Sequence, residues 1–210
     1  MLFRVIYAAA SVNINHSHAF RTYSSRQSSL NPTIVEAVCA TMAVPSHFSP
    51  AKVGPYMRQQ SFVGGALGAN NPTRLLLTEA SGAFGGDQRV SQIISLGSGS
   101  AKALSLDTVS KEAGVARLLN EMAADCEIVA QELSTRLFNV DAYLRLKVEL
   151  EMDNIGIDSW LELGDFETHT RIYLENSAVS EALDVSLKRL QERIGTITLG
   201  RICKSIPTCV

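Results

Sequence analysis

Hydrophobic residues recur along this chain with two different periods, and each period predicts a different kind of element. From Val115 to Leu137 the apolar positions are three and four residues apart, which predicts one long amphipathic helix packed on a core. Over residues 142–151 the period changes to two, with Leu144 on one side and Tyr143 on the other. This alternation predicts a strand with one buried face, near the edge of a sheet.

Three further runs predict short strands. The first is at the N-terminus, where Phe3 to Tyr7 is rich in aromatic and β-branched residues, and a second short strand is expected over Ala19–Tyr23. Residues 1–12 also have the basic residue and apolar run of a weak signal peptide, but their composition favours the strand. The third run, Val90–Leu96, predicts a buried strand that stops at the loop Gly97-Ser98-Gly99-Ser100.

Two helices are expected to begin with an Asn-Pro pair, in which Asn is the N-cap and Pro the first helical residue. Asn31-Pro32 begins a helix that ends before Pro45, and its apolar positions include Ile34, Val35, Val38 and Met42. Cys39 falls on this apolar register and is interpreted as a small core residue. Asn71-Pro72 begins the second helix, over 73–80. Two more helices are predicted over 166–174 and 179–194.

Composition limits the classes of function. With 210 residues, of which 46% are hydrophobic, the chain is long enough for one hydrophobic core. A net charge of -2 and scattered basic residues give no electrostatic basis for binding nucleic acid. The four cysteines match no zinc or redox spacing, and His16 and His18 have no acidic or thiolate neighbours in sequence. We therefore expect reduced thiols, solvated histidines, a cytoplasmic protein, and no metal or cofactor.

Reactive motifs are difficult to find. The nucleophile elbow Gly-x-Ser-x-Gly is absent, and the residues around Ser98 do not have the spacing of this motif. The glycine-rich stretch 61–72 (SFVGGALGANNP) is not followed by the Lys-Ser or Lys-Thr of a phosphate loop. It also contains no group that could transfer a proton. His169 lies on a helical register and is interpreted as a surface or capping residue.

Several stretches, taken together and in order, resemble the patatin-like phospholipase family, and the resemblance spans residues 3 to 193. They are residues 21–23, 40–48, 62–72, 94–99, 122–127, 143–146 and 169–174, and the most specific part is Asn70-Asn71-Pro72 after the glycine-rich stretch. The resemblance implies an α/β fold of three layers, α/β/α, with a mostly parallel central sheet whose N-terminal strands are missing. It implies a partial family domain over 1–195, followed by an irregular tail over 196–210.

The family resemblance also implies a chemistry that this chain cannot complete. Members hydrolyse acyl esters of lipids with a Ser-Asp dyad, in which the aspartate is followed by Gly-Gly or Gly-Ala. Gly64 stands at the position of that aspartate, and Gly65-Ala66 is the rest of the motif. The serine and the oxyanion donors have no counterpart in the sequence. A hydroxyl without a base is a poor nucleophile, so the chain is expected to be an inactive fragment of a lipid acyl hydrolase domain in lipid metabolism.

Two other hypotheses remain open at this stage. The chain could be a non-catalytic binding or regulatory module that pairs with another chain, which would cover the incomplete sheet, or with a lipid surface as a peripheral membrane protein. It could also be an enzyme with another nucleophile, for which Cys39 and the Ser98 loop are the only candidates. The family implies a lipid or acyl-ester ligand.

Overall fold

The computed structural model describes residues 6–11, 17–24, 30–45, 47–97, 99, 125–148, 160–192 and 195–204. The fold is mixed α/β, as the sequence predicts. Where one core is expected, the chain forms two compact units, and each has a hydrophobic cluster of its own. Unit 1 takes Met1–Pro72 and Leu106–Cys126, and unit 2 takes Thr73–Ser105 and Glu127–Val210.

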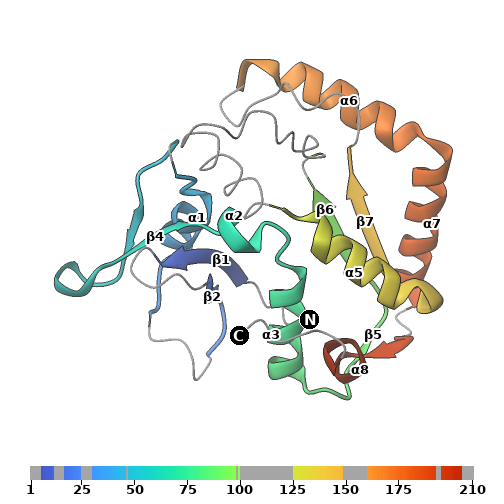
Figure 1. Cartoon of the computed structure of the whole chain (residues 1–210), viewed down its shortest axis with the longest axis horizontal. Coiled ribbons are helices and arrows are strands. Elements are labelled where there is room, and N and C mark those ends of the chain that lie inside the picture. Colours follow the sequence, from blue (N-terminus) through green and yellow to red (C-terminus); the bar gives the residue numbers. More distant parts are fainter. Residues whose placement is uncertain are drawn as a thin grey trace, which may run out of the picture. The chain divides into compact units, whose positions relative to one another are not determined.

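The described part of unit 1 contains a four-stranded sheet and one helix packed on it (Figure 1). Its elements are β1 (Ile6–Ser11), β2 (Ser17–Arg21), α1 (Ile34–Met42), β3 (Ala51–Val53), the 3-10 helix η1 (Tyr56–Arg58), β4 (Gln60–Gly64) and the short helix α2 (Ala66–Ala69). The strand order is β2-β1-β4-β3, and all three pairs are antiparallel. The second predicted strand is confirmed with shifted ends, and so are Ile6 and Tyr7 of the first, whose residues 3–5 lie outside the described residues.

The core of unit 1 lies between this sheet and α1. Phe20 of β2 and Phe62 of β4 are its largest side chains, and their rings meet edge to face at 4.9 Å between centroids. Ala37 and Ala40 of α1 are buried against them, together with Val53. Small side chains on the helix let its backbone approach the strands closely, which leaves the volume of the core to the two aromatic rings.

The N-cap of α1 is not the predicted Asn31. Thr33 takes this position, and its hydroxyl accepts a hydrogen bond from the backbone N–H of Glu36 at 3.2 Å. The Glu36 carboxylate accepts one in return from the Thr33 backbone N–H, at 2.7 Å. This reciprocal capping box satisfies two amide donors of the first turn, which explains why the helix begins after Thr33 and not at Pro32.

The buried face of α1 is also not the predicted one. Ile34 and Val35 are 68% and 71% exposed, and Cys39, expected in the core, is exposed as well. The face that packs on the sheet holds the alanines instead. The large apolar residues gave the stronger sequence signal, but the close helix-to-sheet spacing accommodates only small side chains.

Unit 2 contains a parallel strand pair, an antiparallel strand pair and the longer helices. Its described elements are α3 (Thr73–Phe84), β5 (Arg89–Val90), β6 (Ile93–Gly97), α5 (Glu127–Leu137), η3 (Phe138–Val140), β7 (Tyr143–Lys147), η5 (Trp160–Glu162), α6 (Leu163–Glu175), α7 (Ser177–Glu192), β8 (Ile197–Thr198) and α8 (Leu199–Lys204). The second Asn-Pro helix, α6 and α7 are confirmed, each with shifted ends. Of the long helix predicted over 115–137, residues 127–137 are helical, and residues 115–124 lie outside the described residues.

The strand pairing differs from the expected mostly parallel sheet. Only β6 and β7 pair in parallel among the described strands, while β5 and β8 pair antiparallel. The apolar run predicted as one strand over 90–96 is divided, because Val90 pairs with β8 and residues 93–96 pair with β7. The hydrophobicity of the run predicted burial, but it could not show that its two ends pair with two different strands.

The C-terminal segment is another correction, since residues 197–204 are folded where an irregular tail was expected. β8 pairs with β5, and α8 follows it directly. Leu199 and Ile202 of α8 are buried in the core of unit 2 beside Leu77 of α3. Six residues are too few to show a helical period clearly, so the burial of α8 depends on contacts far away in sequence. Residues 205–210 lie outside the described residues.

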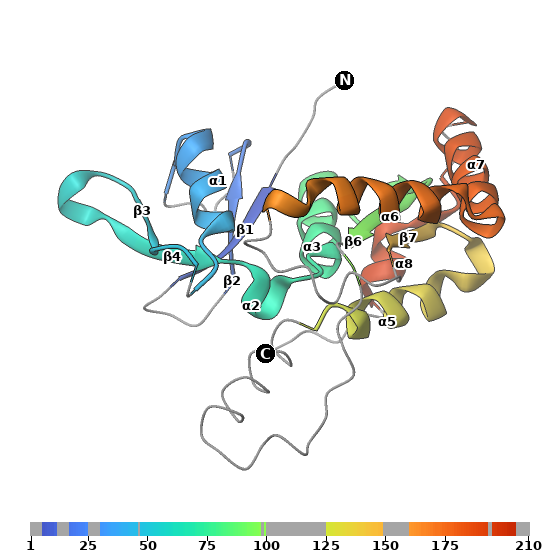
Figure 2. The same cartoon turned by 90° about the horizontal axis from the view of Figure 1, so that it is seen from above.

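β7 is covered more fully than a one-sided edge strand would be. All five of its residues are partly buried. Helix α5 contacts the strand, and so does α7, while Figure 2 shows the β6–β7 pair between α5 and α6. Helices on either side of a parallel pair are the usual arrangement in α/β proteins, because crossover connections place helices on both faces.

Candidate functional site

The glycine-rich stretch is ordered, and part of it is helical. Strand β4 ends at Gly64, Gly65 is the N-cap of α2, and the Ala69 N–H donates to the Gly65 carbonyl at 2.8 Å. Ala66 is the first residue of this helical turn. The stretch therefore forms the end of a strand and a single helical turn, and α3 begins directly after it.

Gly64, the position of the family aspartate, is packed against backbone. Its N–H donates to the Ala43 carbonyl at 2.8 Å, and the residue is buried. A Cβ at this position would lie 3.0 Å from the Thr41 carbonyl oxygen and 3.4 Å from the Val44 nitrogen. These are backbone atoms, which cannot rotate away as a side chain could. The end of β4 thus reaches the C-terminal end of α1 so closely that a side chain at Gly64 would need the backbone to shift by a few tenths of an ångström.

The three residues after α2 differ in burial. Asn70 and Pro72 are exposed, whereas Asn71 is 5% exposed. The Asn71 amide Nδ2 donates to the Cys126 carbonyl at 3.2 Å, joining two segments that are 55 residues apart in sequence. A buried amide that satisfies a distant backbone carbonyl is a structural role. Asn71, in the most specific part of the resemblance, therefore joins the two chain segments that form unit 1.

No catalytic or metal-binding constellation occurs among the described residues. They contain no group of three histidine, cysteine, aspartate or glutamate side chains placed to hold a metal ion. Cys39 is exposed on α1, and Ser98 and His16 lie outside the described residues. The hypothesis of another nucleophile gains no support from Cys39, because the exposed thiol has no partner described here that would activate it.

His18 was expected to be solvated, but the structure places it against aromatic rings. Its ring centroid lies 4.8 Å from that of Phe20 and 5.3 Å from that of Phe62. Burial lowers the pKa of His18 below its ordinary value, and the positive charge of Arg21 lowers it further. The neutral imidazole is thus part of the packing of the unit 1 sheet.

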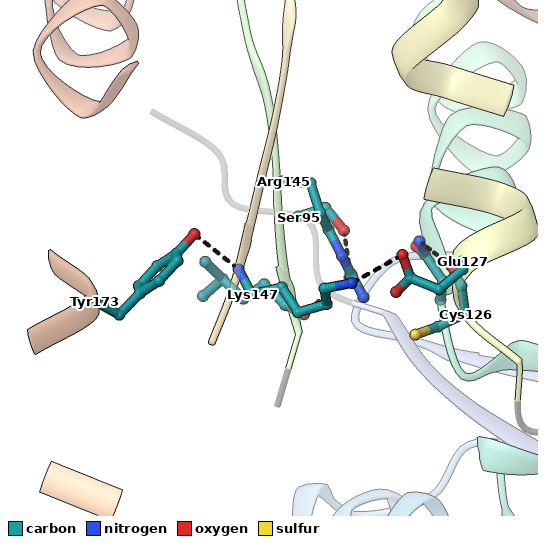
Figure 3. Close-up of polar contacts among 8 residues, drawn as sticks. Ser95, Cys126, Glu127, Arg145, Lys147 and Tyr173 are labelled. Carbon is teal, nitrogen blue, oxygen red and sulfur yellow. Dashed lines mark hydrogen bonds and ion pairs between the residues drawn. The ribbon is translucent and has the colours of Figure 1, made fainter. Parts of the chain in front are cut away.

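A polar cluster that the sequence did not reveal lies on the parallel β6–β7 pair of unit 2 (Figure 3). Ser95 and Arg145 are direct neighbours in this pair. The Arg145 guanidinium donates from Nη1 to the Ser95 hydroxyl at 2.7 Å and to the Leu96 carbonyl at 3.3 Å. The Thr73 hydroxyl lies 3.4 Å from the same Ser95 oxygen. Ser95 and Thr73 are buried, and Arg145 is partly buried.

Gly97 makes room for this cluster. A Cβ at Gly97 would lie 2.6 Å from Nη2 and 2.9 Å from Cζ of Arg145. The guanidinium therefore lies directly over the Cα of Gly97, at the last residue of β6. The sequence placed Gly97 in a loop, and no local signal could link it with a residue 48 positions later.

Next to Arg145, the Lys147 residue joins β7 to two helices. Its Nζ lies 3.0 Å from the Glu127 carboxylate of α5, and its backbone N–H donates to the Tyr173 hydroxyl of α6 at 3.1 Å. Figure 3 shows the Lys147 side chain pointing toward Glu127 and Tyr173 on the other side of the strand. Lys147 is thus paired with α5 through its side chain and with α6 through its backbone.

These residues border a cavity of about 530 Å³ along β7. It is lined by Glu127, Ala130, Gln131, Ser134, Thr135, Tyr143, Arg145, Lys147, Tyr173 and Val179. The lining combines two cations, one carboxylate and several hydroxyl groups, and the Tyr143 hydroxyl is buried without a hydrogen-bond partner among the described residues. Such a lining can hold water or a small polar molecule, but it contains no nucleophile with a base beside it.

Comparisons with known proteins identify no family for this chain. No protein-family model matches it, and no curated protein matches it significantly. Within the described part of the chain, no helix is both long and apolar enough to cross a bilayer.

Proposed function

We propose that this chain is a patatin-like domain that binds lipid acyl esters without hydrolysing them. The family assignment includes the three-layer α/β/α arrangement and a role in lipid metabolism in the cytoplasm. The observation that carries the non-catalytic part is the packing of Gly64, where the family aspartate would stand, against the backbone of α1. The residue at this position carries no carboxylate, and the close backbone of α1 disfavours any side chain there.

Three features support the family part of the proposal. The resembling stretches follow the family order along the chain, with Gly64-Gly65-Ala66 after a strand and Asn71-Pro72 before a helix. β4 ends at Gly64, as the position of the dyad aspartate after a strand requires. The β6–β7 pair is parallel and has helices on both sides, which agrees with a layered α/β arrangement.

Chemistry supports the absence of turnover. Hydrolysis of an ester by a serine requires a base within hydrogen-bond reach and donors that stabilise the developing oxyanion. The sequence contains no nucleophile elbow, and position 64 holds no carboxylate. Binding energy alone does not accelerate the reaction, because only interactions that are stronger in the transition state do so.

Two measurements on the purified chain test the proposal. Isothermal titration with dihexanoyl-phosphatidylcholine below its micellar concentration measures binding, and a free fatty acid assay on the same sample measures hydrolysis. We expect saturable binding with no fatty acid release above that of a heat-denatured sample. Release of fatty acid would refute the absence of catalysis, and a titration without heat would refute the lipid ligand.

A second candidate function is a module that pairs with another chain. It is favoured by the outer edges of the β6–β7 pair, because neither pairs with another described strand, and an unpaired strand edge can accept a strand of another chain. Analytical ultracentrifugation of the purified protein tests this candidate. Self-association supports it, and so does co-sedimentation with an added patatin-like protein that contains the Gly-x-Ser-x-Gly motif. A well-folded monomer that does not bind the added protein refutes it.

A further inference from the structure

The connection between β3 and β4 carries two large apolar side chains that are almost fully exposed. Tyr56 and Met57 are each 89% exposed, the highest values among the large apolar residues described. They lie in η1, at the end of the β3–β4 hairpin that extends away from the rest of unit 1 (Figures 1 and 2). Side chains of this kind rarely remain in water together at a projecting tip unless they contact something.

The tip is an ordered turn. Gly54 has a φ of 110°, which favours glycine, and the Arg58 N–H donates to the Pro55 carbonyl at 2.7 Å. A Cβ at Gly54 would lie 3.3 Å from Leu30, so the turn is packed at its base. Tyr56 and Met57 are therefore held outward before any partner arrives, which lowers the conformational entropy lost on binding.

The charges around the tip have one sign. Lys52 and Arg58 are exposed on the hairpin, and residues 51–64 contain no aspartate or glutamate. The nearest acidic residue described in this part of unit 1 is Glu36, whose carboxylate is bound by Thr33 and by the backbone of Gly54. Two exposed cations beside two exposed apolar side chains match a surface that is negatively charged outside and apolar beneath.

We propose that the β3–β4 tip inserts Tyr56 and Met57 into the interface of an anionic lipid bilayer. Tyrosine suits the headgroup level because its ring is apolar and its hydroxyl polar, and methionine fills irregular apolar space. Lys52 and Arg58 then lie at the height of the headgroups, where each basic residue near an anionic leaflet strengthens binding roughly fivefold. A three-residue turn is too narrow for a typical protein interface of about 800 Å² on each side, which favours the bilayer over a protein partner.

The inference does not depend on the proposed family, and its readout is separate from lipid hydrolysis or monomeric lipid binding. A vesicle can be bound by the tip whether or not the domain also holds an acyl ester. A negative result for vesicle binding would therefore not refute the binding of acyl esters, and the reverse also holds.

A fluorescence experiment on the full chain tests insertion directly. Met57→Trp is made together with Trp160→Phe, so that the introduced residue is the only tryptophan in the protein. Vesicles of phosphatidylcholine with about 30% phosphatidylserine should shift its emission to the blue, and brominated lipid should quench it. Pure phosphatidylcholine vesicles should bind at least fivefold more weakly. An emission spectrum that anionic vesicles leave unchanged would overturn the proposal.

Co-flotation of the protein with vesicles provides the matched controls. Tyr56→Ser/Met57→Ser should reduce the bound fraction at least tenfold, and Lys52→Gln/Arg58→Gln should abolish the preference for phosphatidylserine. Phe138→Ser/Leu161→Ser removes two apolar side chains that are 79% and 78% exposed in unit 2, and it should leave binding unchanged. Equal losses from the unit 2 variant and the tip variant, with both folded by circular dichroism, would refute a role specific to the tip.

Discussion

Arg145 and Ser95 face each other across the parallel β6–β7 pair, and the guanidinium Nη1 donates to the serine hydroxyl at 2.7 Å. The hydroxyl is buried, and it also lies 3.4 Å from the hydroxyl of Thr73. A hydrogen bond with a charged donor is stronger than one between neutral groups, so this bond contributes more than most to the stability of the pair. The relationship ties β6, β7 and the start of α3 into one polar cluster.

Ser95→Ala should destabilise the protein by about 1–3 kcal/mol, since Arg145 loses a buried acceptor. Urea denaturation followed by circular dichroism measures the change. Ser186→Ala is the matched control, because Ser186 is also buried but its hydroxyl has no hydrogen-bond partner among the described residues. We expect the Ser186 variant to be neutral or more stable, and equal losses in both variants would contradict a specific role of the Arg145 bond.

Gly97→Ala should also destabilise unit 2, by about 1 kcal/mol, because the new methyl group displaces the Arg145 guanidinium from its hydrogen bond to Ser95. The same denaturation experiment measures it. Gly82→Ala serves as the control, since nothing lies within 4 Å of a Cβ at Gly82 in α3. Alanine in a helix interior should raise stability there by about 0.5–1 kcal/mol. A Gly97 variant as stable as the parent chain would show that Arg145 has another position available.

At Gly64, alanine should cost about 1–3 kcal/mol because the Cβ meets backbone atoms of Thr41 and Val44. Gly164→Ala, where the space is open, is the control. Gly64→Asp restores the family motif but should be at least as destabilised, and it should give no hydrolysis of a p-nitrophenyl ester. Ester turnover by this single variant would mean that the active site has been misplaced.

Glu36 predicts a pH dependence at low pH. Hydrogen bonds from the Thr33 backbone and hydroxyl, and from the Gly54 backbone, lower the pKa of Glu36 below its ordinary value. Its unfolded pKa is about 4.3, so its contribution is complete above that pH and is lost as the pH falls through the lower folded value. The stability difference between the parent and Glu36→Gln should therefore shrink on acidification. In a Thr33→Ala background this pH-dependent difference should become smaller but persist, because the variant loses the hydroxyl and keeps the backbone N–H that bonds to Glu36.

His18 predicts a second dependence, nearer to neutral pH. Burial and then Arg21 lower its pKa, so the unfolded chain binds a proton more readily than the folded one. Stability from the neutral His18 is thus complete above about pH 6.5 and is lost as the pH falls through the folded pKa. The thermal midpoint of His18→Gln should vary less over this range. An NMR titration of Arg21→Gln should show the pKa of His18 closer to its ordinary value.

Local patterns determined the elements whose signals are contained in a few turns of chain. Helices α6 and α7 and strand β7 lie where hydrophobic period alone placed them, and α3 begins directly after Asn71-Pro72. These predictions hold because a helical or alternating pattern depends on neighbours within a few residues. The sequence also determined that no base stands at position 64, whatever the fold around it.

Tertiary structure decided everything that depends on which surfaces meet. In the fold, the alanine face of α1 packs on the sheet and the face with Ile34 and Val35 does not. One apolar run pairs with two different strands, and the short helix α8 is buried. Tertiary structure also brought Arg145 over Gly97 and packed Gly64 against α1. Contacts between residues tens of positions apart leave no period in the sequence, because they depend on close approach in space and not on spacing along the chain.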